Sequence, residues 1–449
     1  MKLLRLLLAL LLVTIYFSCN KSTTNSDSEP TTVIFADANF EMLIRETLNI
    51  PDGDILDTDL LTITTLIGAD RNIANISGIE YCINLDTLNL AGNNISDISL
   101  ISQLVNLTNL DIGNNPITNI SALANLTNLV NLKMHSIGID NISALAGLTN
   151  LSTLWFSYNV VSDINVLTNL TNLTDLRFHS NQVTDISILG SLTNLDVISI
   201  GRNQISDITP ISNLTNLTTL WMNSNQIDDI NPISNLTNLV TLDFFGNQVS
   251  DISPLNNLTN LTRLTASDNQ ITDISSIGNL TNLDELYITD NQIIDISPLG
   301  NLINLDRLLI QGNQISDISA LANISQLTYL SIGTNQLSDI SSLQSLTNLT
   351  YLNLYNNQIT DISVLSNLVG LIELFIHNND IVDITPLTDL INLDLVYLQN
   401  NQVVDILALV NNTGISYGDE IRLTGNPLSQ TSIDTYIPQL EARGVTVHH

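Results

Sequence analysis

The chain of 449 residues contains 44 aspartates and glutamates against 12 lysines and arginines, which gives a formal net charge of −32 at pH 7. A body this acidic repels nucleic acid phosphates and anionic lipid surfaces, which excludes both as partners. Hydrophobic residues make up 44% of the chain, enough for a large core, and two cysteines provide no disulfide framework.

The first 18 residues have the layout of a signal peptide. Lys2 and Arg5 lead into the apolar run 6–17, which is followed by a polar stretch. The apolar run is too short to span a membrane comfortably. Residues 1–18 are therefore predicted to direct export and to be absent from the mature protein.

The residues at the end of this segment suggest a lipid anchor. Ser18 directly before Cys19 resembles the cleavage box of bacterial lipoproteins, although Tyr16 stands where that family usually has leucine. The resemblance implies that Cys19 is lipidated, that residues 19–32 are a flexible tether, and that the chain is anchored to the cell envelope. The outer membrane is the expected membrane, and the lipid is the only expected membrane contact. Ordinary signal cleavage, with Cys19 incidental, is the alternative.

Residues 33–65 precede any repeat and are predicted to form a helical N-terminal cap. Phe40, Leu43, Ile44 and Leu48 have helical spacing, and Asp37 stands before them as a candidate N-cap.

A 22-residue repeat then fills the predicted solenoid, residues 66–410. Asparagines recur on one grid from Asn93 to Asn401 and give about sixteen units, with Arg71 and Ile137 breaking the grid. Each unit carries the pattern L-x-x-L-x-L-x-x-N-x-I-x-D-I. The L-x-L alternation predicts a short strand, and a single unit cannot bury its leucines unless neighbouring units stack on it.

The pattern resembles the leucine-rich repeat, and the unit length with its D-I-S-x-L turn resembles the bacterial internalin type, over roughly residues 33–447. The resemblance implies an α/β solenoid with a curved parallel sheet on its concave face and short 3-10 or helical turns on its convex face. It also implies binding to other proteins, as internalin-like proteins bind host receptors.

Other repeat positions have structural interpretations. The column asparagine is expected to satisfy backbone groups of the loops. The residue after each D-I pair, such as Ser99 or Thr209, is predicted to be the N-cap of a turn whose first residue is a proline in some units, as at Pro210. The column aspartates from Asp97 onward are expected to make loop hydrogen bonds. Cys82 falls on a core leucine column and is predicted to be buried.

The C-terminal cap is predicted over residues 411–449, where the register slips. Asn426 follows the grid at a spacing of 25, and Pro438 is expected to kink or split a helix. An uncovered end would otherwise expose core leucines.

Aromatic and basic side chains gather at three outward strand positions of each unit, whereas Phe156, Phe178 and Phe244 replace core leucines. Lys133 and His135 occupy outward positions too, and Arg263, Glu285 and Arg307 are expected to form a charge ladder. Aromatic rings with arginines are typical of binding hot spots. The residues predicted to bind a partner are Trp155, Arg177, His179, Trp221, Phe245, Arg263, Tyr287, Arg307, Tyr329, Tyr351, Tyr355, Phe375, His377 and Tyr397.

No catalytic residues, metal site or cofactor are predicted. His135 and His179 share a column two units apart, about 10 Å by the strand spacing, which is too far for one metal ion without a third ligand. The predicted function is that of a monomeric envelope lipoprotein, not an enzyme, whose concave face binds a protein. A glycan-binding surface protein is the alternative, and a passive envelope spacer is a third interpretation.

Overall fold

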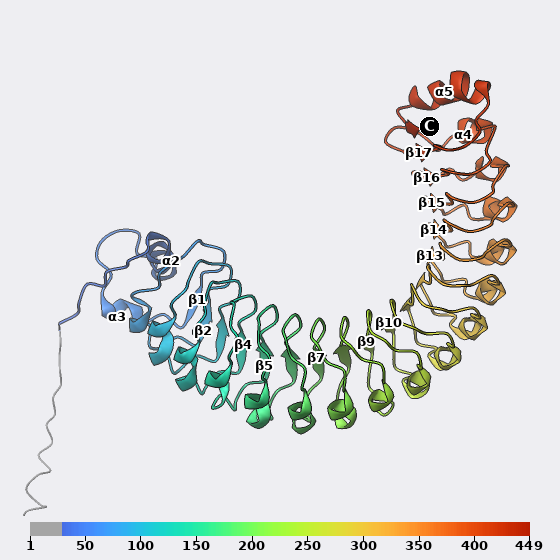
Figure 1. Cartoon of the computed structure of the whole chain (residues 1–449). Helices are drawn as coiled ribbons and strands as arrows, with labels where there is room; N and C mark the ends of the chain where they lie inside the picture. Colours follow the sequence, from blue (N-terminus) through green and yellow to red (C-terminus); the bar gives the residue numbers. More distant parts are fainter. Residues whose placement is uncertain (1–28) are drawn as a thin grey trace, which may run out of the picture.

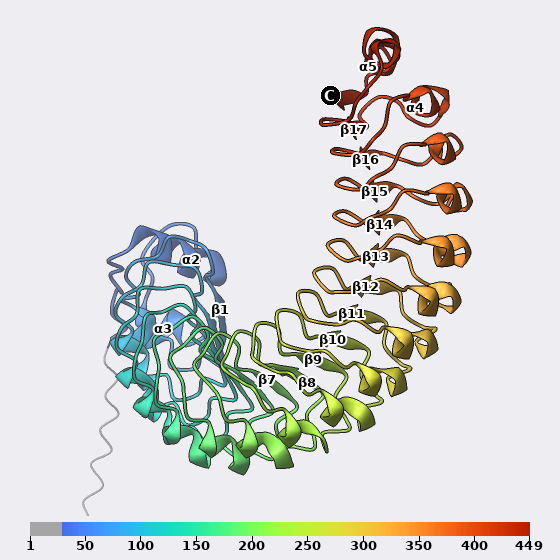
Figure 2. The same cartoon turned by 45° about the vertical axis from the view of Figure 1, so that its right-hand side comes forward.

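The computed structural model describes residues 29–449, so the predicted signal peptide, Cys19 and most of the predicted tether lie outside the described residues. The described chain is one curved solenoid (Figure 1). A parallel sheet of 18 strands lines the inner side of the curve, and short helical turns follow its outer side, as a second view also shows (Figure 2). The predicted fold is confirmed.

All strands are three residues long and pair with the next strand in the chain. Partners are 22 residues apart from β1 to β16, as in Thr65 with Thr87, and the spacing lengthens at β17, where Leu395 pairs with Glu420. The strands are β1 (Thr65–Ile67), β2 (Thr87–Asn89), β3 (Asn109–Asp111), β4 (Asn131–Lys133), β5 (Thr153–Trp155), β6 (Asp175–Arg177), β7 (Val197–Ser199), β8 (Thr219–Trp221), β9 (Thr241–Asp243), β10 (Arg263–Thr265), β11 (Glu285–Tyr287), β12 (Arg307–Leu309), β13 (Tyr329–Ser331), β14 (Tyr351–Asn353), β15 (Glu373–Phe375), β16 (Leu395–Tyr397), β17 (Glu420–Arg422) and β18 (Thr446–His448).

Short helices alternate with the strands. They are α2 (Ala38–Leu48), α3 (Asp57–Leu60), the 3-10 turns η1 (Ile79–Tyr81), η2 (Ser99–Gln103), η3 (Ser121–Asn125), η4 (Ser143–Leu145), η5 (Asn165–Asn169), η6 (Ser187–Ser191), η7 (Thr209–Asn213), η8 (Asn231–Ile233), η9 (Ser253–Asn257), η10 (Ser275–Asn279), η11 (Ser297–Asn301), η12 (Ser319–Asn323), η13 (Ser341–Ser345), η14 (Ser363–Asn367) and η15 (Thr385–Leu387), then α4 (Leu407–Asn411), the π-helical η16 (Ser432–Tyr436) and α5 (Ile437–Glu441).

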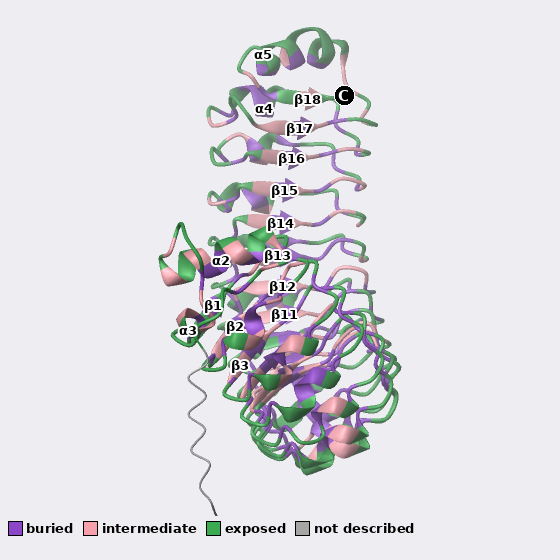
Figure 3. Cartoon of the chain, turned by 90° about the vertical axis from the view of Figure 1, so that its left-hand side faces the viewer, coloured by how far each residue is buried: buried purple, intermediate pink, exposed green. Residues whose placement is uncertain are grey.

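The core runs the length of the solenoid behind the sheet, because the middle residue of nearly every strand points inward (Figure 3). Phe156 and Phe178 are fully buried and stack with ring centroids 5.4 Å apart, and Phe244 is buried as well. Cys82 is also fully buried, as predicted. Burial raises the pKa of its thiol to about 12, so it remains a protonated apolar side chain.

The column asparagines hydrogen-bond backbone groups of the loops, as predicted, and form a ladder that is interrupted at Ile137. Asn203 shows the pattern: its Nδ2 donates to the carbonyls of Ile200 and Gly201, at 3.1 and 3.2 Å, and to that of Phe178 in the preceding unit, at 3.2 Å. Its Oδ1 accepts from the N–H of Val183 at 2.9 Å. Each asparagine thereby pairs buried backbone groups that the three-residue strands leave unpaired.

The predicted N-caps of the convex turns are wrong. Ser99 and Thr209 are the first residues of η2 and η7, and the preceding aspartates, Asp97 and Asp207, accept their N–H groups at 2.8 Å through Oδ1. The carboxylate accepts the N–H two residues after it, as in an Asx-turn, whereas a serine N-cap would accept an N–H two or three residues after the serine. Pro210 is accordingly the second residue of its turn. The loop role expected of the column aspartates is confirmed, and these hydrogen bonds hold the pKa of Asp97 below its ordinary value.

The N-terminal end of the core is covered by α2, as predicted. Asp37 caps the helix by accepting from the N–H groups of Asn39 and Phe40 through Oδ1. Its Oδ2 accepts from Ala74 and Asn75, which lie in the first repeat, at 2.7 and 3.2 Å. Burial alone would raise the pKa of Asp37, but these four donors hold it below its ordinary value.

Replacing Asp37 with alanine is expected to lower the free energy of unfolding of the N-terminal end by about 1–2 kcal/mol, because both a helix cap and a tertiary anchor are lost. Hydrogen exchange of the amides of α2 measures this directly. Asp52→Ala, which removes an exposed carboxylate from the same cap, is the control and is expected to leave exchange unchanged. Equal protection in the two variants would contradict the capping role.

The C-terminal cap extends the sheet and covers its core. β17 and β18 continue the parallel pairing, and α5 lies over the end of the solenoid (Figure 1). The helical run before β18 changes from π to α at Ile437, next to Pro438, in agreement with the predicted split. Within residues 29–449, no helix is long and apolar enough to cross a membrane.

Candidate interaction surface

Three columns of side chains form the concave face of the sheet. The first column precedes the buried central residue of each strand, the second follows it, and the third lies two residues beyond the second. Parallel pairing in register places equivalent residues side by side, as with Trp155 and Arg177. All fourteen residues predicted to bind a partner occupy these columns, so one face carries them.

The structure divides these residues into two clusters. The first, here called the tryptophan cluster, contains Lys133, Trp155, Arg177 and Trp221. Lys133 Nζ lies over the Trp155 ring at 4.1 Å from its centroid, and the Arg177 guanidinium lies over the same ring at 4.3 Å. The two cations come from the strands on either side of β5, so the indole lies between them. Arg177 also reaches the Trp221 ring at 5.4 Å.

The second cluster, here called the aromatic ribbon, crosses six strands from β12 to β17. It runs through Arg307, Tyr329, Tyr351, Phe375, Tyr397 and Arg422. Ring centroids are 3.8 Å apart between the two tyrosines of β13 and β14, then 5.2 and 4.9 Å at the next two steps. A guanidinium lies 4.3 Å from the ring centroid at each end. Tyr329 and Tyr351 stack face to face, whereas Phe375 is tilted by 42° against Tyr351 and meets Tyr397 edge to face at 86°.

A second row of rings borders the ribbon in the third column. Tyr355 and His377 stack with centroids 5.1 Å apart. A Cβ at Gly333 would collide with the Tyr355 ring, so the absence of a side chain there allows the tyrosine to lie against the backbone of the loop that follows β13. Burial and the charge of Arg422 lower the pKa of His377, which is therefore neutral at pH 7.

The segment between the clusters is charged and carries few rings. Arg263 pairs with Glu285 at 3.1 Å, but Arg307, the third member of the predicted charge ladder, packs on Tyr329 instead. Tyr287 donates to Glu285 at 2.8 Å. Phe245 is 39% exposed and lies outside both clusters, although it shares their face.

Arg422 is the functional candidate that the repeat pattern missed. It lies beyond the last grid asparagine, where the spacing of strand partners becomes 25 residues. It packs on Tyr397 and pairs with Glu420 at 2.5 Å. The sequence does contain a signal for this strand. Glu420, Ile421 and Arg422 alternate polar, apolar and polar, and Glu420 lies six residues before Asn426, the same distance as from Thr153 to Asn159.

Three arginines of the concave face are paired with carboxylates. Arg177 holds Asp175 through two hydrogen bonds of 2.8 and 2.9 Å. The pairs Arg263–Glu285 and Arg422–Glu420 likewise combine an arginine with a carboxylate. Among the described residues, no three His, Cys, Asp or Glu side chains gather as a metal ion would require.

Comparison with known proteins gives the family. A family profile described as Leucine Rich repeats (2 copies) matches residues 83–125, 171–213, 215–257, 259–301, 303–345, 335–367 and 347–389, more than half of the chain. The chain belongs to the leucine-rich repeat family. A search of curated proteins found no match.

Among solved structures, this leucine-rich repeat protein is similar to an internalin from Listeria monocytogenes, with 37% identity over 85% of this chain and 94% of that one, and a TM-score of 0.50. A leucine-rich repeat protein of Leptospira interrogans shares the fold, with 23% identity over 88% and 97% of the two chains and a TM-score of 0.73. The ectodomain of an Arabidopsis thaliana receptor kinase does so too, with 22% identity over 85% and 49% and a TM-score of 0.70. The chain is therefore internalin-like.

Proposed function

We propose that this chain binds a protein partner on its concave face and performs no chemistry of its own. The observation that carries the proposal is the aromatic ribbon, a row of four rings held between two arginines on a rigid sheet. Tyrosine and arginine dominate protein interface hot spots, and rings already fixed by their neighbours lose little conformational freedom on binding. The Arabidopsis receptor ectodomain was solved in complex with CASPARIAN STRIP INTEGRITY FACTOR 2, an example of ligand binding by the same fold.

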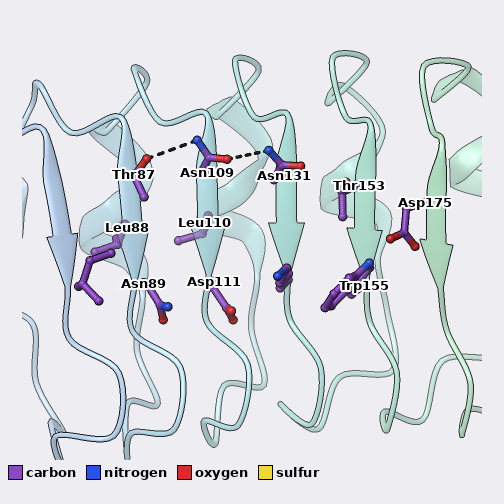
Figure 4. A pocket seen from close by; sticks show the side chains of 12 residues that line it. Thr87, Leu88, Asn89, Asn109, Leu110, Asp111, Asn131, Thr153, Trp155 and Asp175 are labelled. Carbon is purple, nitrogen blue, oxygen red and sulfur yellow. Dashed lines mark hydrogen bonds between the residues drawn. The ribbon is translucent and has the colours of Figure 1, made fainter.

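The alternative ligand is a glycan. A hollow of about 370 Å³ at the N-terminal end of the concave face favours it, because Asn89, Asn109, Asn131 and Asp111 line it with polar groups (Figure 4). Sugar rings bind proteins largely through the faces of aromatic rings. Figure 4 shows the Trp155 side chain almost edge-on at this hollow, and its faces are already in contact with Lys133 and Arg177. The geometry therefore supports the protein ligand better.

Capture experiments with the chain from residue 20 onward test the proposal. The immobilised protein is exposed to protein extracts and, in parallel, to a glycan array. The double variant Tyr351→Ala, Phe375→Ala is expected to lower affinity for a captured protein by at least about a hundredfold, since two central rings are removed. The control variant Tyr81→Ala, Tyr417→Ala removes exposed tyrosines outside the concave face and is expected to bind as the parent does.

Two outcomes would contradict this function. Strong array signals that depend on Trp155 would favour the glycan ligand. Equal capture by the double variant and the control would leave the concave face unused, as expected of a passive spacer. The proposal takes the chain to be a monomer, which light scattering of the purified protein measures.

We also propose that the protein is anchored to the cell envelope through a lipid on Cys19, with the outer membrane as its membrane. The support is the Ser18-Cys19 pair after an apolar run. Cys19→Ala is expected to move the protein from the detergent phase to the aqueous phase in a phase-partition experiment. Protease shaving of intact cells then shows whether the solenoid faces the exterior.

A further inference from the structure

A small cavity opens beside Trp155 on the concave face. Its volume is about 220 Å³, below the roughly 300 Å³ at which pockets for drug-sized ligands begin, so it suits a group of side-chain size. We call it the Arg177 cavity. Its lining residues are His135, Trp155, Ser157, Tyr158, Arg177 and His179.

The cavity is a positive spot on an acidic protein. None of the six lining residues is acidic, in a chain with 44 aspartates and glutamates. The pKa of His179 is lowered first by burial and then by the positive charges of Arg202 and Arg177 and by His135, which indicates the sign of the local potential. Asp175 opposes this charge and accepts two of the five N–H groups of Arg177, one on Nε and one on Nη2, so three N–H groups on Nη1 and Nη2 remain.

Two further donors of the lining are buried without a partner among the described residues. Asn114 Nδ2 lies 3.1 Å from Nε2 of His135, and because an amide NH₂ only donates, Nε2 accepts. The proton of the neutral ring therefore lies on Nδ1, which has no hydrogen-bond partner. The indole Nε1–H of Trp155 is unpaired in the same way. Both side chains line the cavity, and a buried donor without a partner costs free energy.

We propose that the Arg177 cavity binds a single carboxylate, the side chain of an aspartate or glutamate on the protein partner. The inference rests on the proposed function, and it specifies the functional group that the protein partner presents to this cavity. A carboxylate is a pure acceptor, and its charge pairs with the N–H groups of Arg177 that remain free in a lining without acidic residues. The net charge of −32 repels a ligand with many negative charges, so one local carboxylate on a folded protein fits better than a polyanion.

A fluorescence titration tests the cavity without knowledge of the partner. The chain has two tryptophans, Trp155 and Trp221, so Trp221→Phe leaves Trp155 as the only reporter. The chain without its first 19 residues, which keeps every described residue, is titrated with N-acetyl-glutamate N-methylamide at constant ionic strength. The neutral glutamine analogue is the matched control probe, and glucuronate tests an acidic sugar. A saturable change in Trp155 emission is expected in the millimolar range with the glutamate probe and not with the glutamine probe.

Two arginine variants, both in this reporter background, locate the response. Arg177→Gln is expected to weaken binding of the glutamate probe by at least about tenfold, because the cavity loses its cation. Arg263→Gln removes another arginine that pairs with a carboxylate on the same face, and it is expected to change the affinity by less than about twofold. Circular dichroism confirms that both variants fold.

The outcomes are distinguishable. An equal response to the glutamine probe, a response to glucuronate alone, or no saturable response to any probe would overturn the proposal. So would an equal loss in the two arginine variants. Binding of the glutamate probe by a chain that captures no protein partner would instead support the cavity and contradict the proposed function.

Discussion

Phe244→Ala is expected to lower the free energy of unfolding by about 3–5 kcal/mol, whereas Phe245→Ala, one residue later, is expected to cost less than about 1 kcal/mol. Phe244 is fully buried and Phe245 is 39% exposed on the concave face. Removing the first ring loses apolar burial and leaves a cavity that neighbouring units cannot close without shifting the sheet. The second ring borders solvent, so water replaces it.

Chemical denaturation followed by circular dichroism measures both variants, and hydrogen exchange locates the weakened units. A solenoid is held by contacts between neighbouring units, so the loss is expected to concentrate around β8 to β10. Similar costs for the two substitutions would mean that the two phenylalanines do not point to opposite sides of the sheet.

Asn203→Ala is expected to lower the free energy of unfolding by about 2–4 kcal/mol, although it removes no apolar surface. The substitution leaves the carbonyls of Phe178, Ile200 and Gly201 and the N–H of Val183 without their side-chain partner. A buried backbone group without a partner costs about 1–3 kcal/mol, and water that enters the loop offsets part of the sum.

Gln204→Ala is the matched control for this asparagine. Gln204 is the next residue and is exposed. Its substitution is expected to change the free energy of unfolding by less than about 0.5 kcal/mol, as is usual for surface positions. A stability loss at Gln204 as large as that at Asn203 would contradict the ladder.

Asn203→Asp separates the two kinds of hydrogen bond, because a carboxylate keeps the acceptor for the N–H of Val183 but loses all three donated hydrogen bonds.

Much of the fold was predictable because its contacts repeat with the sequence. A leucine at the same place in each unit must meet its equivalents, so the grid alone implied a parallel sheet and a buried Cys82. The same reasoning placed Trp155, Tyr287 and Tyr351 on one face. It failed at the convex turns, where Ser99 is the first residue of the turn and donates its N–H to Asp97, because only the backbone path decides at which residue the turn begins.

The sequence predicted which face of the sheet carries the candidate site, but it did not predict which side chains on that face contact each other. The grid treated Trp155, Phe245 and Tyr397 as equivalent, whereas the structure separates a cation–tryptophan group from the aromatic ribbon and leaves Phe245 outside both. Arg422 was missed because its unit is longer than 22 residues, so the count that located the other cations no longer applied.

The sequence by itself determined the solenoid, its period and the side of the sheet on which the rings lie, since strand alternation and a fixed repeat leave no other way to bury the leucines. Only the tertiary structure decided which rings stack, that Arg307 packs on Tyr329 and not on Glu285, and that His135 and Trp155, each with an unpaired buried nitrogen, line the same cavity as Arg177. These contacts depend on side-chain rotamers and on the distance between neighbouring strands. Residues 22 positions apart in the chain come into contact only after the sheet has formed.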